Sequence, residues 1–298
     1  MSDRHPGRKV PVILDTDIGI DVDDTWALAL LLKSPELELK LLTTCTGDTR
    51  YRARLAARML QVAGRSDVPV GIGIPLDGQR RPQEAWAAGF HLGRYAGTVH
   101  EDGVGAMVET IMSSPQPVTL IAIGPTPNVA AALARQPQIA RRCRYVGMQG
   151  NLRPGDKGGD KVVAEYNVVK YPHSCQAVFA APWEMTITPL DTCGRVRLHG
   201  GKFAAVRDSG DPLARAVIEN YRLWTDEPRR ETESSILFDT VAVYLAFAED
   251  LLVMEDLPVR VTDEGFTVIE QGARRIRCAT DWKDLPAFED LLVRRLTT

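Results

Sequence analysis

The sequence lacks paired cysteines, clustered histidines, a long apolar run and an excess of basic residues. Its five cysteines are widely separated without a CxxC pair, and its five histidines show no HxH or HxxxH spacing, so neither a disulfide framework nor a zinc site is indicated. The longest apolar helical pattern, residues 26–32, is too short to cross a bilayer, and residues 1–9 have no apolar signal core. A formal net charge of -3 argues against nucleic-acid and anionic-membrane partners. We therefore expect a cytoplasmic protein that binds a small molecule.

Apolar runs and helical patterns alternate along most of the 298 residues. This alternation favours an α/β fold with an open, largely parallel sheet flanked by helices. The expected strands are residues 10–14, 39–44, 68–72, 118–123, 144–148, 185–189, 258–261, 267–270 and 275–279. The expected helices are residues 25–33, 51–63, 106–113, 128–135, 174–180, 212–223, 237–246 and 285–295. No repeat or linker divides the chain, so we expect a single domain over residues 1–298, with the irregular stretches 73–105 and 150–161 as candidate lids.

The most distinctive segment is residues 12–24, in which a β-branched apolar run leads into a loop with five aspartates. The pattern predicts a strand, a loop and then a helix, so the carboxylates gather at the carboxyl end of a strand, where open α/β sheets bind ligands. Several carboxylates held together repel one another unless a cation neutralises them. The oxygen-rich composition suits a hard divalent ion, Ca²⁺ or Mg²⁺.

Four further segments place polar groups at strand ends or helix starts. Asp48 is positioned to accept a hydrogen bond from a sugar hydroxyl or to cap a helix, and the turn 124–128, with two prolines, can direct carbonyl oxygens at a hard cation. Glu165 and Asn167 flank an aromatic residue and suit ribose hydroxyls. Asp239 opens an apolar helix, where it serves either as a metal ligand or as a simple helix cap.

In combination these motifs resemble one family. The DTDxG…DD loop, the GPxxN turn, Met148-Gln149-Gly150, Glu165-Tyr166-Asn167 and the late aspartate occur in the order found in the inosine/uridine-preferring nucleoside hydrolases, over roughly residues 10–248. The resemblance implies a Rossmann-like nucleoside hydrolase fold, one Ca²⁺ at the floor of a pocket, and hydrolysis of a ribonucleoside to ribose and free base. It also implies nucleoside salvage and a homodimer or homotetramer.

The resemblance also assigns roles to individual residues. Asp17 is expected to bind the metal and to act as general base, Asp24 and Asp239 to supply further carboxylate ligands, and Pro127 to contribute its backbone carbonyl. The residues expected to contact substrate are Asp23, Asp48, Met148, Glu165, Asn167 and Asp239.

Two departures from the family pattern bear on these roles. Two extra residues separate the loop glycine from the paired aspartates, which leaves Asp21 as an alternative metal ligand. Phe238 stands where members that accept both purines and pyrimidines carry a histidine, and phenylalanine cannot donate a proton to the leaving base. Other candidates for the base side, each of which has core packing or solvent exposure as its competing interpretation, are Trp86, His91, His100, Tyr221, Arg222 and Trp224.

Two other functions are compatible with parts of the pattern. An apolar strand followed by Asp-x-Asp also begins haloacid-dehalogenase-like phosphatases, in which Asp15 would be the nucleophile and Asp17 the acid, but no convincing later metal loop or lysine accompanies it. Because Phe238 has no acidic proton to donate to the leaving base, the second alternative is a protein that binds nucleosides or ribose without turnover.

Overall fold

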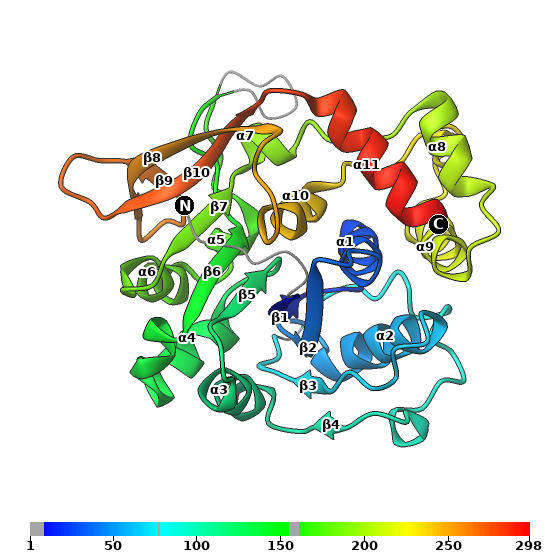
Figure 1. Cartoon of the computed structure of the whole chain (residues 1–298), viewed down its shortest axis with the longest axis horizontal. Helices are drawn as coiled ribbons and strands as arrows, with labels where there is room; N and C mark the ends of the chain where they lie inside the picture. Colours follow the sequence, from blue (N-terminus) through cyan, green and yellow to red (C-terminus); the bar gives the residue numbers. More distant parts are fainter. Residues whose placement is uncertain (1–8, 77, 155–160) are drawn as a thin grey trace.

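The computed structural model describes residues 9–76, 78–154 and 161–298, and its centre is a ten-stranded sheet (Figure 1). The strands are β1 (Val10–Thr16), β2 (Leu37–Thr44), β3 (Val70–Ile72), β4 (Val99–His100), β5 (Val118–Ala122), β6 (Cys143–Met148), β7 (Met185–Thr188), β8 (Leu252–Val261), β9 (Thr267–Ile269) and β10 (Arg275–Trp282). Their order is β4-β3-β2-β1-β5-β6-β7-β10-β8-β9. Every pairing from β4 to β10 is parallel, whereas β8 pairs antiparallel with β10 and β9. The predicted open, largely parallel sheet is confirmed.

Helices cover both faces of the sheet, which explains why β1 is apolar at every position from Val10 to Leu14. The helices are α1 (Asp23–Leu32), α2 (Thr49–Val62), α3 (Gly103–Ser113), α4 (Pro127–Arg135), α5 (Tyr166–Val169), α6 (Pro172–Ala180), α7 (Leu190–Cys193), α8 (Gly200–Arg207), α9 (Pro212–Trp224), α10 (Phe238–Leu245) and α11 (Leu285–Thr297). Helices α1, α2, α9, α10 and α11 lie on one side of the sheet, and α3, α4 and α6 lie on the other (Figure 1). Val12 and Leu14 pack into the cluster of the first group, while Ile13 packs into the cluster of the second.

Each predicted element has a counterpart in the structure, although β8 begins at Leu252, six residues before the predicted start. The structure adds β4, whose two residues are too short to show a period, and α8, which begins with two glycines that disfavour a helix. It also adds the single-turn helices α5 and α7. The candidate lid 73–105 contains β4 and a short 3₁₀ helix, Leu92–Arg94, and residues 155–160 of the second candidate lid lie outside the described residues.

The cysteines and the helix lengths complete the description of the fold. All five cysteines are buried and free in the structure. Over the described ranges, no helix combines the length and apolar character that crossing a membrane requires.

Candidate active site

The acidic loop lies where the strand order of the sheet changes direction. Strand β1 pairs with β2 on one side and β5 on the other, so the chain runs outward from β1 along both halves of the sheet. Asp15, near the carboxyl end of β1, is in register with Thr43 of β2 and Ala122 of β5. The loop that follows is therefore flanked by two further strand ends, in the position where doubly wound sheets bind ligands.

Two glycines allow close packing at this loop. Gly19 has a φ of +106°, and a Cβ there would lie 2.8 Å from the Tyr51 ring. A Cβ on Gly124, just after β5, would lie 2.8 Å from Asp17 Oδ1 and 2.9 Å from its backbone nitrogen. Since any side chain at position 124 would displace Asp17, this glycine fixes how closely β5 and the acidic loop can pack.

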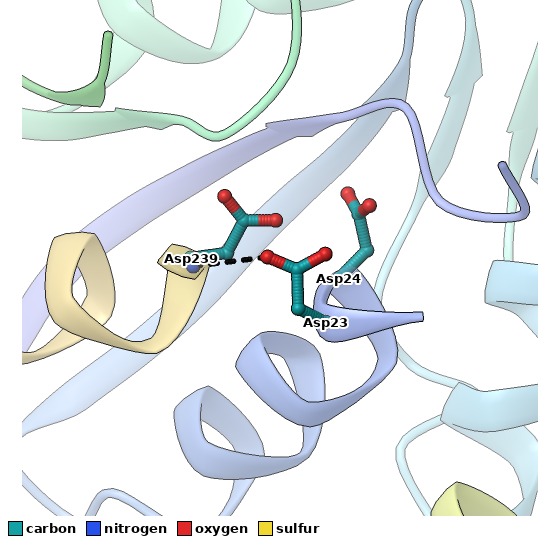
Figure 2. A group of neighbouring side chains, drawn as sticks. All are labelled: Asp23, Asp24 and Asp239. Carbon is teal, nitrogen blue, oxygen red and sulfur yellow. Dashed lines mark hydrogen bonds between the residues drawn. The ribbon is translucent and has the colours of Figure 1, made fainter. Parts of the chain in front are cut away.

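Three carboxylates converge beside the loop, and they come from two helices that are far apart in the sequence. Asp23 and Asp24 begin α1, Asp239 lies in the first turn of α10, and one oxygen from each lies within 4.8 Å of the others (Figure 2). The Asp239 backbone nitrogen donates to Asp23 Oδ2 at 3.2 Å, and the Thr16 hydroxyl donates to Asp24 Oδ1. All three aspartates are buried, so the contact between α1 and α10 assembles a compact group of oxygen donors.

These carboxylates form the floor of a cavity of about 480 Å³. Asp17 and Asp21 line the same cavity, so four of the five loop aspartates face one space together with Asp239. The remaining polar or aromatic lining residues include Arg80, Glu165, Tyr166, Asn167 and Trp224, and the apolar ones include Ile123, Met148, Leu190 and Phe238. The structure therefore brings most of the predicted site residues together.

Burial and mutual repulsion disfavour the ionised form of these carboxylates. Burial raises the pKa of Asp17 to about 6, with a lowering contribution from the Arg52 guanidinium and a further rise from Asp21. Burial raises the pKa values of Asp23, Asp24 and Asp239 well above their usual range, and the neighbouring aspartates raise them further.

The donor set fits a hard divalent cation. Arg52 is buried nearby, but its guanidinium donates to the carbonyl oxygens of Ile18 and Thr46 at 3.0 and 2.9 Å rather than to an aspartate. The cluster therefore offers closely spaced carboxylate oxygens. The positive charge of Arg52 acts on their negative charge without a direct hydrogen bond. A cation of the Ca²⁺ or Mg²⁺ class satisfies such oxygens, and it would lower the pKa values that burial raises.

Glu165, Asn167 and Met148 form an adjoining wall. The Glu165 carboxylate caps α5, accepting from the Asn167 and Gly150 backbone nitrogens at 2.7 and 3.0 Å. The Asn167 side-chain nitrogen donates to the carbonyl oxygens of Met148 and Ile123 at 2.9 and 3.2 Å. These contacts tie α5 to the ends of β5 and β6 and hold both polar side chains in the cavity. Burial raises the pKa of Glu165 to about 7.

Two predicted site residues lie outside this set. Asp48 caps α2 by accepting from the Tyr51 backbone nitrogen at 2.9 Å, and it pairs with Arg81 at 2.9 Å. Pro127 is buried at the first residue of α4 and is not among the described residues that line the cavity. The contact of Asp48 with a sugar hydroxyl and the carbonyl ligand at Pro127 stay predictions.

The candidates for the base side separate in the same way. Trp224 lines the cavity and donates to the Ile20 carbonyl at 3.1 Å. The other candidates do not line it in the described part of the chain, namely Trp86, His91, His100, Tyr221 and Arg222. Sequence reasoning missed Arg80, for which no motif gave a signal, and Tyr166, which was treated only as a spacer between Glu165 and Asn167.

Asp15 lies beneath the cavity rather than in it. Its Oδ1 accepts from the Thr43 hydroxyl at 2.6 Å and from Asn128 Nδ2 at 2.8 Å, and the side chain is fully buried. Burial raises its pKa to about 7. A phosphatase nucleophile has to reach its substrate, so this placement does not support the phosphatase alternative.

Comparison with known proteins gives a consistent result. The family model described as inosine-uridine preferring nucleoside hydrolase matches residues 12–290. The pyrimidine-specific ribonucleoside hydrolase RihA of Salmonella arizonae is 31% identical over 231 residues, covering 70% of each chain. Two solved structures share the fold: the plant nucleoside hydrolase PpNRh1 (TM-score 0.84, 21% identity, 98% of this chain and 100% of that one) and an inosine-uridine preferring nucleoside hydrolase from Bacillus anthracis (TM-score 0.78, 18% identity, 97% and 99%).

Proposed function

Because this chain belongs to the inosine-uridine preferring nucleoside hydrolase family, a family of hydrolases that act on N-glycosyl bonds, we propose that it is a Ca²⁺-dependent ribonucleoside hydrolase that releases ribose and free base. The observation that carries the proposal is that Asp17, Asp24 and Asp239 line one cavity, in which oxygens of Asp23, Asp24 and Asp239 lie within 4.8 Å of one another. Asp17, Asp24 and Asp239 would hold the ion through carboxylate oxygens, and Pro127 through its carbonyl. A bound ion of this class would lower the pKa of a water nucleophile and would attract sugar hydroxyls through its positive charge.

Asp17 is the proposed general base. Its carboxylate lies in the cavity, and the positive charge of Arg52 lowers a pKa that burial alone would raise further. The carboxylate takes a proton from the attacking water as the new O–C1′ bond forms. The C1′–N bond breaks at the same time, and its electron pair remains on the base. Positive charge that develops on the sugar is stabilised by the surrounding aspartates.

The ribose is proposed to occupy the floor of the cavity. Asp23, Glu165 and Asn167 are 3%, 3% and 5% exposed there, so only small parts of these polar side chains face the cavity. Hydrogen bonds from Asn167 and to Glu165 hold both residues against the backbone, which fixes their orientation before substrate binds. Met148 lies beside them and would contact the 5′ side of the sugar.

The function is tested with purified protein, a panel of purine and pyrimidine ribonucleosides, and an assay for reducing sugar. We expect ribose to be released in the presence of Ca²⁺, to disappear after chelation, and to return when Ca²⁺ is added back. Phe238 favours one alternative, a protein that binds nucleosides without turnover. Calorimetric binding of a nucleoside with no ribose formed from any member of the panel would support that alternative and refute the hydrolase.

The assignment of metal ligands within the loop gives a separate prediction. Asp24 belongs to the group with oxygens within 4.8 Å of one another, whereas Asp21 is partly exposed on the cavity wall. We therefore expect Asp24→Asn to lose bound calcium and the matched variant Asp21→Asn to retain about one equivalent. Equilibrium dialysis with calcium analysis measures both. Loss of calcium from Asp21→Asn together with retention in Asp24→Asn would show that the extra loop residues bring Asp21 into the metal site.

We also propose that the protein is a homodimer or homotetramer of the cytoplasm that acts in nucleoside salvage. These proposals are supported by the family resemblance. Light scattering after size-exclusion chromatography tests the assembly.

A further inference from the structure

A chain of hydrogen bonds leads from a buried arginine to the cavity. Arg52 is 1% exposed, and besides its contacts with backbone carbonyls it donates from Nη2 to Gln79 Oε1 at 2.5 Å. Gln79 Nε2 donates in turn to the Tyr166 hydroxyl oxygen at 2.9 Å. Gly47 leaves space for these hydrogen-bonded side chains, because a Cβ there would lie 2.6 Å from Gln79 Oε1 and 2.8 Å from Arg52 Nη2.

The direction of these bonds is fixed by chemistry. A guanidinium has only donors, so the amide oxygen of Gln79 must face Arg52 and its NH₂ group must face Tyr166. The Tyr166 oxygen is therefore an acceptor in this contact, and its own O–H remains available to donate. No acceptor for that O–H is found among the hydrogen bonds of the described residues. The positive charge of Arg52 polarises the chain and strengthens the Tyr166 O–H as a donor.

Tyr166 is a more exposed part of the cavity lining than the acidic floor is. Asp24 and Asp239 on the floor are 2% and 3% exposed, whereas Tyr166 is only partly buried and Arg80, which also lines the cavity, is exposed. If the ribose occupies the acidic floor, its base extends toward the mouth, between Tyr166 and Trp224. Phe238 also lines the cavity, but its ring offers the base no hydrogen-bond donor.

We propose that the Tyr166 hydroxyl, held by Gln79 and Arg52, donates a hydrogen bond to the departing base and stabilises the negative charge that develops on it. The inference rests on the proposed function and adds the leaving-group contact that Phe238 cannot make. The acceptor on the base is a ring nitrogen or a carbonyl oxygen, and no proton has to leave the tyrosine. Burial raises the pKa of Tyr166 to about 12, so the hydroxyl keeps its proton at neutral pH.

The test compares two leaving groups in the variant Tyr166→Phe, which removes only the hydroxyl. Uridine or inosine releases a base that requires stabilisation, whereas 4-nitrophenyl β-D-riboside releases a phenolate that is stable without it. We expect the ratio of kcat/KM for the nucleoside to kcat/KM for the riboside to fall about 10- to 100-fold, as for the loss of one hydrogen bond made in the transition state. A purely structural defect would lower both values together and leave the ratio unchanged.

Two further variants complete the experiment. Tyr171→Phe removes a hydroxyl from a tyrosine that does not line the cavity, and we expect the ratio to stay at the wild-type value. Gln79→Met removes the amide that orients Tyr166, and we expect a smaller fall in the same ratio. An unchanged ratio in Tyr166→Phe would overturn the inference. Wild-type protein that hydrolyses neither compound would instead overturn the proposed function, so the two failures are distinguishable.

Discussion

Asp17→Asn is expected to lower kcat by about 100- to 10,000-fold, the range for loss of a general base. Asparagine has nearly the same shape as aspartate, so it preserves packing against Gly124, where there is no room for a larger group. It removes the proton acceptor and weakens one metal ligand. Turnover of a nucleoside at saturating Ca²⁺ measures the loss, and thermal unfolding confirms that the variant is folded.

Asp15→Asn is the matched control, because Asp15 is equally buried, lies in the same segment and does not line the cavity. Asparagine keeps an Oδ1 that can accept from Thr43 and Asn128. We expect this variant to lose far less kcat than Asp17→Asn. The roles assigned to the two residues would be reversed if Asp15→Asn lost turnover while Asp17→Asn retained it.

The strand, acidic loop and helix at the start of the chain were predictable because they are encoded locally. An apolar run with β-branched residues indicates a buried strand, and the following aspartates have no reason to accumulate in an ordinary surface loop. The late Asp239 could be placed in the same site only through the family resemblance, since its contact with Asp23 joins residues that are far apart in the sequence. Packing of α10 against α1 creates that contact, and no spacing rule predicts it.

Asp48 shows how one local pattern permits two outcomes. An aspartate before a helix is a good cap and also a good ligand for a sugar hydroxyl. In the structure it caps α2 and pairs with Arg81, a residue from the irregular stretch between β3 and β4. That stretch has no period from which its path could be predicted. For the same reason Arg80 and the contact between Gln79 and Tyr166 were not foreseen.

Removal of the metal is expected to make the stability of the protein fall as pH rises from about 5 to 8. Burial raises the pKa of Asp17 to about 6 and those of Asp15 and Glu165 to about 7, whereas unfolded carboxyl groups titrate near 4. The folded state therefore binds more protons than the unfolded state across this range, and its stability decreases with increasing pH. Exposed carboxylates with lowered pKa values, such as Asp67, change the stability of the protein only below about pH 4, so they do not oppose this trend.

Calcium is expected to reverse the trend, because the ion favours the ionised carboxylates and its binding releases protons. The increase in Tm caused by Ca²⁺ should therefore be larger at pH 8 than at pH 5.5, as measured by calorimetry with chelator or with Ca²⁺. Asp239→Asn serves as the comparison, since it removes both a metal ligand and one of the repelling charges. It should show little calcium-induced change in Tm and a weaker dependence on pH in chelator. A metal-free wild-type protein that became more stable between pH 5 and 8 would contradict the proposed coupling between the buried aspartates and the ion.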